Sequence, residues 1–112
     1  MNGNMQPASL SKEFKLKVAA EYKKNRKMLE ELNLAALESF ASVLLEMIRK
    51  EKEENGSSHD LEVLESSMRH LKRDAAQFGV SQAGTDEYDF ARNDCNSLVE
   101  STKKWLELEG MI

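Results

Sequence analysis

One apolar stripe runs through the first half of the chain, and it limits the possible folds more than any other feature. Between residues 14 and 47, apolar side chains recur at steps of three, four or seven residues, which is the repeat of an α-helix. The members of the stripe are Phe14, Val18, Tyr22, Leu29, Leu32, Ala36, Phe40, Val43 and Met47. Because the phase never resets, the pattern predicts one helix over about residues 12–54, roughly 65 Å long. A break near Asn33, whose side chain could cap a second helix, is the alternative.

Two shorter helices are predicted after this stripe, over about residues 59–78 and 86–109. In both, apolar residues alternate at spacings of three and four, which is the heptad pattern of helices packed side by side. Gly56 suits the left-handed residue that ends a helix, and Ser57 or Ser58 can cap the next one. Thr85 is the expected cap of the last helix, and Trp105 stands near its heptad seam.

These elements predict an all-α fold, an antiparallel three-helix bundle or coiled coil with a long N-terminal helix. The connections are short, so neighbouring helices should run antiparallel. We expect a disordered start over residues 1–10 and a single domain over residues 11–112. The two later helices, roughly 30–36 Å each, would cover only the C-terminal half of the first helix. Residues 12–27 would then project beyond the bundle as an arm.

The arm is strongly basic, although the whole chain has a formal net charge of −4. Residues 12–27 contain seven Lys and Arg against two Glu, a net charge of +5. The cations predicted to make electrostatic contacts are Lys12, Lys15, Lys23, Lys24, Arg26 and Lys27. The opposite side of the arm carries an apolar face that comprises Phe14, Val18, Tyr22 and Leu29. An exposed apolar face of this length calls for a partner, so these four residues are the predicted partner-binding site.

The predicted function is a non-catalytic helical module for protein–protein interaction, an adaptor, scaffold or assembly unit that associates with itself or with another helical protein. The alternative is a nucleic-acid-binding protein that uses the basic arm. Base reading favours arginine, and stacking on bases needs aromatic side chains among the cations. Residues 15–27 contain one arginine, Arg26, and one aromatic residue, Tyr22, which lies on the apolar side. Protein interaction is therefore the favoured interpretation.

A second alternative comes from residues 69–79, RHLKRDAAQFG, which resemble the motif of the phosphotransfer domains of two-component signalling. In that motif a His precedes a Leu-Lys-Gly run, and a Gly follows some seven residues after the Lys. The residues that match are Leu71, Lys72, Phe78 and Gly79. Arg69 stands where the family has its phosphoryl-accepting His, and Arg73 stands where it has a small Gly. The resemblance therefore implies an inactive phosphotransfer-like signalling domain.

No residues predict catalysis, a metal site or a cofactor. Cys95 occupies a core heptad position, where a Cys usually acts as a small hydrophobic residue. No apolar run approaches the roughly 20 residues that span a bilayer, so no membrane contact is expected. A single Cys and the lack of a hydrophobic leader favour an intracellular, cytoplasmic protein, with the nucleus as the alternative.

Overall fold

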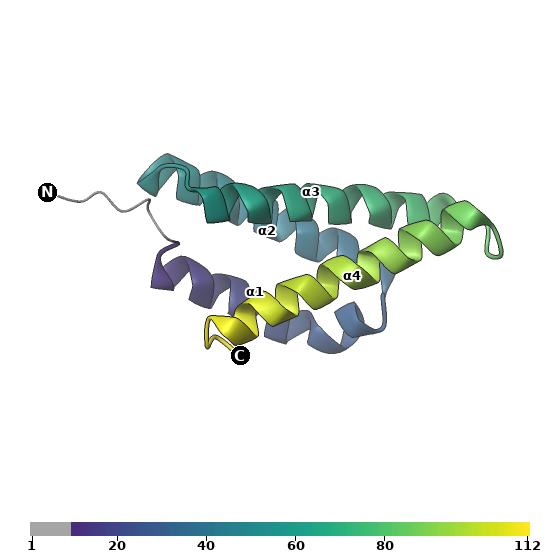
Figure 1. The fold of residues 1–112 in the computed structure, drawn as a ribbon, viewed down its shortest axis with the longest axis horizontal. Helices are drawn as coiled ribbons and strands as arrows, with labels where there is room; N and C mark the ends of the chain where they lie inside the picture. The colour runs from purple at the N-terminus through teal and green to yellow at the C-terminus, as the bar shows by residue number, and fades with distance from the viewer. Residues whose placement is uncertain (1–9) are drawn as a thin grey trace, which may run out of the picture.

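The computed structural model describes residues 10–112 and folds them into four helices without strands. Helix α1 spans Lys12–Glu30, α2 spans Leu34–Asn55, α3 spans His59–Val80 and α4 spans Asp86–Leu108. Three short connections, 31–33, 56–58 and 81–85, link them, so that each helix runs antiparallel to the next (Figure 1). The predicted all-α class is confirmed, but the bundle has four helices where the sequence pattern predicts three.

The four helices form a closed ring around one core. Helix α1 packs against α2 and α4, and α3 packs against the same two helices, so α1 and α3 are diagonal neighbours (Figure 1). The largest fully buried side chains come from all four helices and include Tyr22, Phe40, Ile48, Met68 and Leu106. Tyr22 and Phe40 meet edge to face with ring centroids 6.3 Å apart, which joins α1 to α2.

The predicted continuous helix over residues 12–54 is wrong, because the chain turns back at residues 31–33. Leu32 has a φ of 57°, in the left-handed region that ends many helices. The Leu32 N–H donates to the Leu29 carbonyl at 3.0 Å, and the Asn33 N–H donates to the Met28 carbonyl at 2.9 Å. This pair of bonds is a Schellman motif, and it terminates α1.

Asn33 starts the next helix, as the alternative interpretation proposed. Its side-chain oxygen accepts a hydrogen bond from the Ala36 N–H at 3.0 Å. A helical wheel does not reveal the break, because the apolar stripe keeps its phase on both sides of the connection. A Leu at the left-handed position also gives no signal, since that conformation favours glycine and costs other residues roughly 1–2 kcal/mol.

The consequence is that no arm projects from the bundle. The apolar side chains of Phe14, Val18, Tyr22 and Leu29 are between 0% and 3% exposed and belong to the core of the protein itself. The expectation that they form an exposed partner-binding face is therefore wrong. They face inward because α1 folds back along α2 and closes the ring against α4.

The N-terminal end of α1 is held in place by polar contacts. The Ser11 hydroxyl accepts from the Phe14 N–H and lies 3.3 Å from a carboxylate oxygen of Glu51 in α2. Lys15 forms an ion pair with Glu109, just after α4. Most of the predicted disordered start, residues 1–9, lies outside the described residues. Leu10, which that prediction included, is buried in the core.

Helices α3 and α4 begin at the predicted residues, with Ser58 and Thr85 as their N-caps. Helix α3 continues two residues past its predicted end, through Gly79. A Cβ atom at Gly79 would lie only 2.6 Å from Cδ2 of Leu34, so the glycine lets α3 approach the start of α2. At the same end, the rings of Phe78 and Tyr88 pack with centroids 5.1 Å apart and join α3 to α4.

Replacement of the cap at the break is the first test of this fold. Asn33→Ala removes the acceptor for the Ala36 N–H and should lower the free energy of unfolding by about 1 kcal/mol. Urea unfolding followed by circular dichroism measures the change. Asn96→Ala, at an exposed position in the middle of α4, is the control and should leave stability unchanged or slightly higher. Equal effects of both substitutions would contradict a helix start at residue 33.

Burial of the α1 stripe gives a second prediction. Val18→Glu places a carboxylate in a fully buried site and should lower the free energy of unfolding by more than about 3 kcal/mol. Ala20→Glu, at an exposed position two residues away, should be close to neutral. Thermal unfolding compares the two variants. A folded, stable Val18→Glu protein would show that α1 does not pack in the core.

Candidate functional site

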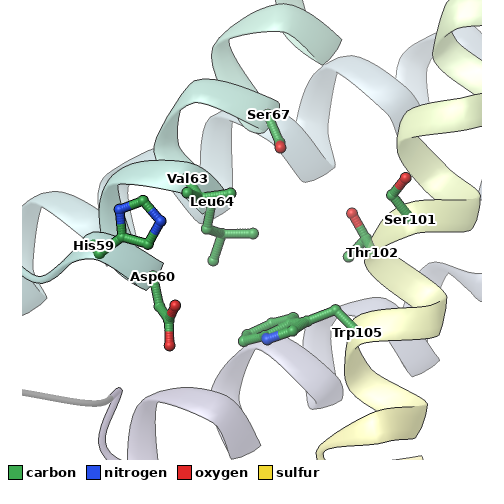
Figure 2. A pocket seen from close by; sticks show the side chains of 8 residues that line it. All are labelled: His59, Asp60, Val63, Leu64, Ser67, Ser101, Thr102 and Trp105. Atoms are coloured by element: carbon green, nitrogen blue, oxygen red, sulfur yellow. The ribbon is translucent and has the colours of Figure 1, made fainter.

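The clearest hollow in the described part of the chain is a groove between α3 and α4 (Figure 2). It encloses about 320 Å³ near the start of α3 and the end of α4. Its lining residues are His59, Asp60, Val63, Leu64 and Ser67 from α3, and Ser101, Thr102 and Trp105 from α4. Steps of three and four residues place these side chains on one face of each helix, so that the two faces oppose each other.

The groove has apolar walls and a polar margin. Trp105 extends from α4 toward α3, opposite Leu64 and Val63 (Figure 2). Val63 is 52% exposed, and Trp105 is half-buried although the heptad pattern places it near the core. The Thr102 hydroxyl donates to the Leu98 carbonyl of its own helix at 2.9 Å. An apolar surface with few polar groups can hold apolar side chains of a ligand, and the polar margin can orient them.

Sequence reasoning missed this groove. The signal that could have found it is Val63, an apolar residue outside the heptad series of α3, which runs through Leu61, Leu64 and Met68. A β-branched apolar residue on the solvent side of a helix marks a contact surface only when the neighbouring helix contributes apolar area beside it. Trp105 supplies that area, but nothing in the spacing of the two helices brings Val63 and Trp105 together.

The structure places the predicted basic residues on the outer side of α1. Lys12, Lys23, Lys24, Arg26 and Lys27 are exposed, and Lys15 is half-buried in its ion pair with Glu109. Arg26 pairs with Glu30 on the same helix at 3.3 Å, and its guanidinium lies 6.0 Å from the centre of the Tyr22 ring. Among residues 10–112, the remaining four lysines have no ion-pair partner.

The segment that resembles phosphotransfer domains lies on α3. His70 is exposed, and its Nδ1 lies 2.9 Å from the Ser66 carbonyl oxygen. Arg69 pairs with Glu65 at 3.2 Å, and both line a shallow polar hollow together with His70 and Arg73. The position that holds the phosphoryl-accepting His in that family therefore carries an exposed arginine, and the inactive relative remains a hypothesis.

Cys95 is fully buried, as its heptad position predicts. Burial, and to a smaller extent the nearby carboxyls of Asp74 and Asp94, raise the pKa of its thiol to about 12. A thiol with this pKa stays protonated at neutral pH. The thiolate is the nucleophilic form of cysteine, so the protonated Cys95 side chain serves only to pack α4 against α3.

Asp74 is the one carboxyl buried in the described core, with 5% of its surface exposed. Its Oδ2 atom has no hydrogen-bond partner, and Arg73 lies 3.9 Å from its Oδ1. Burial, and next the neighbouring carboxyl of Asp94, together raise the pKa of Asp74 to about 6. Arg73 and His70 lower the pKa of Asp74 by smaller amounts. Two carboxyls in one place cannot both ionise freely.

Residues 10–112 contain no group of three or more His, Cys, Asp or Glu side chains arranged to hold a metal ion. Within the same range, no helix combines the length and the apolar character needed to cross a membrane. Comparison of the chain with protein-family models, curated proteins and solved structures finds no match.

The buried carboxyl predicts an unusual dependence of stability on pH. The pKa of Asp74 is higher in the folded chain than its ordinary value of 3.8, so folding binds a proton more tightly. The stabilisation is therefore complete below about pH 4 and is lost as the pH rises through about 6. Asp74→Asn removes the titration and should raise the free energy of unfolding at pH 7 by about 3 kcal/mol.

Urea unfolding at pH 5 and pH 7 tests this prediction. The wild-type chain should be more stable at pH 5, and Asp74→Asn should flatten that difference. Glu38→Gln, an exposed carboxyl in α2, serves as the control and should keep the wild-type pH dependence. An Asp74→Asn protein with an unchanged pH dependence would show that another group titrates.

Proposed function

We propose that this chain is a non-catalytic helical module for protein–protein interaction, and that it binds a helix of its partner in the groove between α3 and α4. The observation that carries the proposal is the facing pair of Val63 and Trp105, two apolar side chains that the fold leaves accessible on opposite walls of one groove. Amphipathic helices bind such grooves by inserting apolar side chains spaced three or four residues apart.

The length of the apolar surface favours a helical partner over a small molecule. Leu108 is 86% exposed and lies one turn beyond Trp105, so accessible apolar area continues past the groove toward the end of α4. An apolar surface that continues along one helix matches an elongated ligand better than a compact one. The partner is another helical protein or a second copy of this chain.

Nucleic-acid binding is the second candidate, because five exposed lysines of α1 have no ion-pair partner within residues 10–112. These are Lys12, Lys17, Lys23, Lys24 and Lys27. Phosphate groups could neutralise these cations. The fold supports this candidate less well than the first. Tyr22 is fully buried, so α1 presents no aromatic side chain on which a base could stack.

The groove can be tested through the single tryptophan of the chain, Trp105. The probe is a synthetic amphipathic peptide of about 18 residues, without net charge and with leucine at positions i, i+4 and i+7. Binding should shift the Trp105 emission to shorter wavelength as the indole loses water. Val63→Glu should weaken binding at least tenfold, because it brings a carboxylate into the apolar contact.

Val80→Glu is the matched control, since Val80 is 81% exposed and lies at the end of α3, away from the groove. It makes the same chemical change and should leave peptide binding unchanged. Equal binding by the Val63→Glu and Val80→Glu proteins would contradict a site in the groove, and so would the lack of any emission shift in a folded wild-type chain.

A further inference from the structure

We propose that the outer side of α1 binds the first turns of α4 of a second copy of this chain, and that two copies form a twofold dimer through two such contacts. This inference rests on the proposed function, for which it names one partner and a surface apart from the groove.

The basic side of this contact is a face of α1 that we call the lysine face. It consists of Lys12, Leu16, Lys23 and Lys27, whose spacings of 4, 7 and 4 place them along one side of the helix. Leu16 is 49% exposed in the midst of the cations. The three lysines have no ion-pair partner within residues 10–112. The face therefore combines unneutralised positive charge with an accessible apolar side chain.

The complementary surface is the first part of α4. Asp86, Glu87 and Asp89 are exposed in its first turn, and Phe90 follows them with 68% of its surface exposed. Residues 86–94 carry four carboxylates against one arginine, Arg92. This segment thus offers negative charge around an accessible apolar side chain, which is the counterpart of the lysine face in both charge and polarity.

Within residues 10–112, no ion pair joins the two surfaces of one molecule. Helix α1 runs antiparallel to α4, since Lys15 pairs with Glu109 and Tyr22 is close enough to Glu100 for that carboxylate to raise its pKa. The start of α4 lies farther along the molecule, where the α3–α4 connection extends past the connection between α1 and α2 (Figure 1). A second molecule can bring the first turns of α4 to the lysine face.

A second copy is favoured over a nucleic acid as the occupant. Leu16 stands within the lysine face, and a phosphate backbone would gain nothing from it, whereas Phe90 of another copy can pack against it. Each copy presents one basic and one acidic surface, so a twofold arrangement makes the same contact twice and leaves neither surface open. Exposed ion pairs are individually weak and are screened by salt, so the dimer should form only at high protein concentration and low salt.

The test is the molar mass in solution, measured by light scattering and sedimentation with the protein at about 0.3 mM, because a contact built on exposed ion pairs is weak. The wild-type chain should be dimeric at low salt and should dissociate at about 0.5 M salt. Lys23→Glu with Lys27→Glu should weaken dimerisation at least tenfold, and so should Asp86→Lys with Asp89→Lys. Lys50→Glu with Lys72→Glu, two exposed lysines outside the lysine face, makes the same change in charge and should leave the dimer intact.

A mixture of the two charge-reversed proteins provides the decisive measurement. Each protein alone opposes like charges in both contacts, whereas the mixed pair has one native contact and one fully reversed contact, so the mixture should form heterodimers. A wild-type chain that is monomeric at 0.3 mM in low salt would overturn the dimer, and a mixture that stays monomeric would overturn the assignment of its surfaces. Peptide binding in the groove is measured separately and survives either result.

Titration with a duplex DNA at about 150 mM salt tests whether a nucleic acid, instead of a second copy of the chain, binds the lysine face. Weak binding that is unaffected by Lys23→Glu with Lys27→Glu is the expected result. Sub-micromolar binding that this double substitution abolishes would overturn the inference and assign the lysine face to nucleic acid.

Discussion

The fold depends on the left-handed turn at Leu32. A leucine in this conformation costs roughly 1–2 kcal/mol relative to ordinary helical geometry. Two interactions offset this cost: the Leu32 side chain is buried, and Asn33 caps the helix that follows. The turn sends α1 back along α2, where its apolar stripe covers the core that α2, α3 and α4 leave open. Without the turn, Phe14 and Val18 would face water and the ring would lack its fourth wall.

The sequence predicts most of this structure wherever periodicity and capping agree. Ser58 and Thr85 mark the starts of α3 and α4, and their heptad residues enter the core. The break at residues 31–33 could not be predicted with the same rules, because the stripe keeps its phase and leucine is an unusual residue for φ above zero. Because the break is not predicted, the α1 stripe is also expected to be an exposed contact surface, whereas it is buried in the core.

Of the two candidate surfaces, the sequence predicts the exposed lysines but not the groove. Exposure of the lysines follows from the amphipathic pattern of α1, since charged residues opposite an apolar stripe face water. The groove depends on how far α3 and α4 stand apart near Trp105, and this is a property of helix packing that no local pattern contains. Val63 can be recognised as part of a contact surface only when Trp105, across the groove, is also known.

The apolar side chains that α4 packs against α3 are smaller than those that α2 packs against α3. Helix α2 buries Leu37, Phe40, Leu44 and Ile48 beside Ala36 and Ala41, whereas α4 buries Ala91, Cys95, Val99, Thr102 and Leu106, of which only Leu106 is large. The buried carboxyl of Asp74 also lies on the side of α3 that faces α4, where Asp94 opposes its ionisation. Helix α4 therefore contributes smaller apolar side chains to the core than α2 does.

The distribution of charge on α1 favours a negative surface packed against the lysine face. Folding requires the buried stripe of α1, but it does not require three unpaired lysines on the opposite side. Lys23 and Lys27 stand four residues apart on one helix, a spacing at which like charges destabilise the helix by about 0.2–0.5 kcal/mol. Within residues 10–112, neither lysine has an ion-pair partner. A negative surface placed against α1 removes that repulsion, which makes the lysine face more stable when it is covered than when it is free.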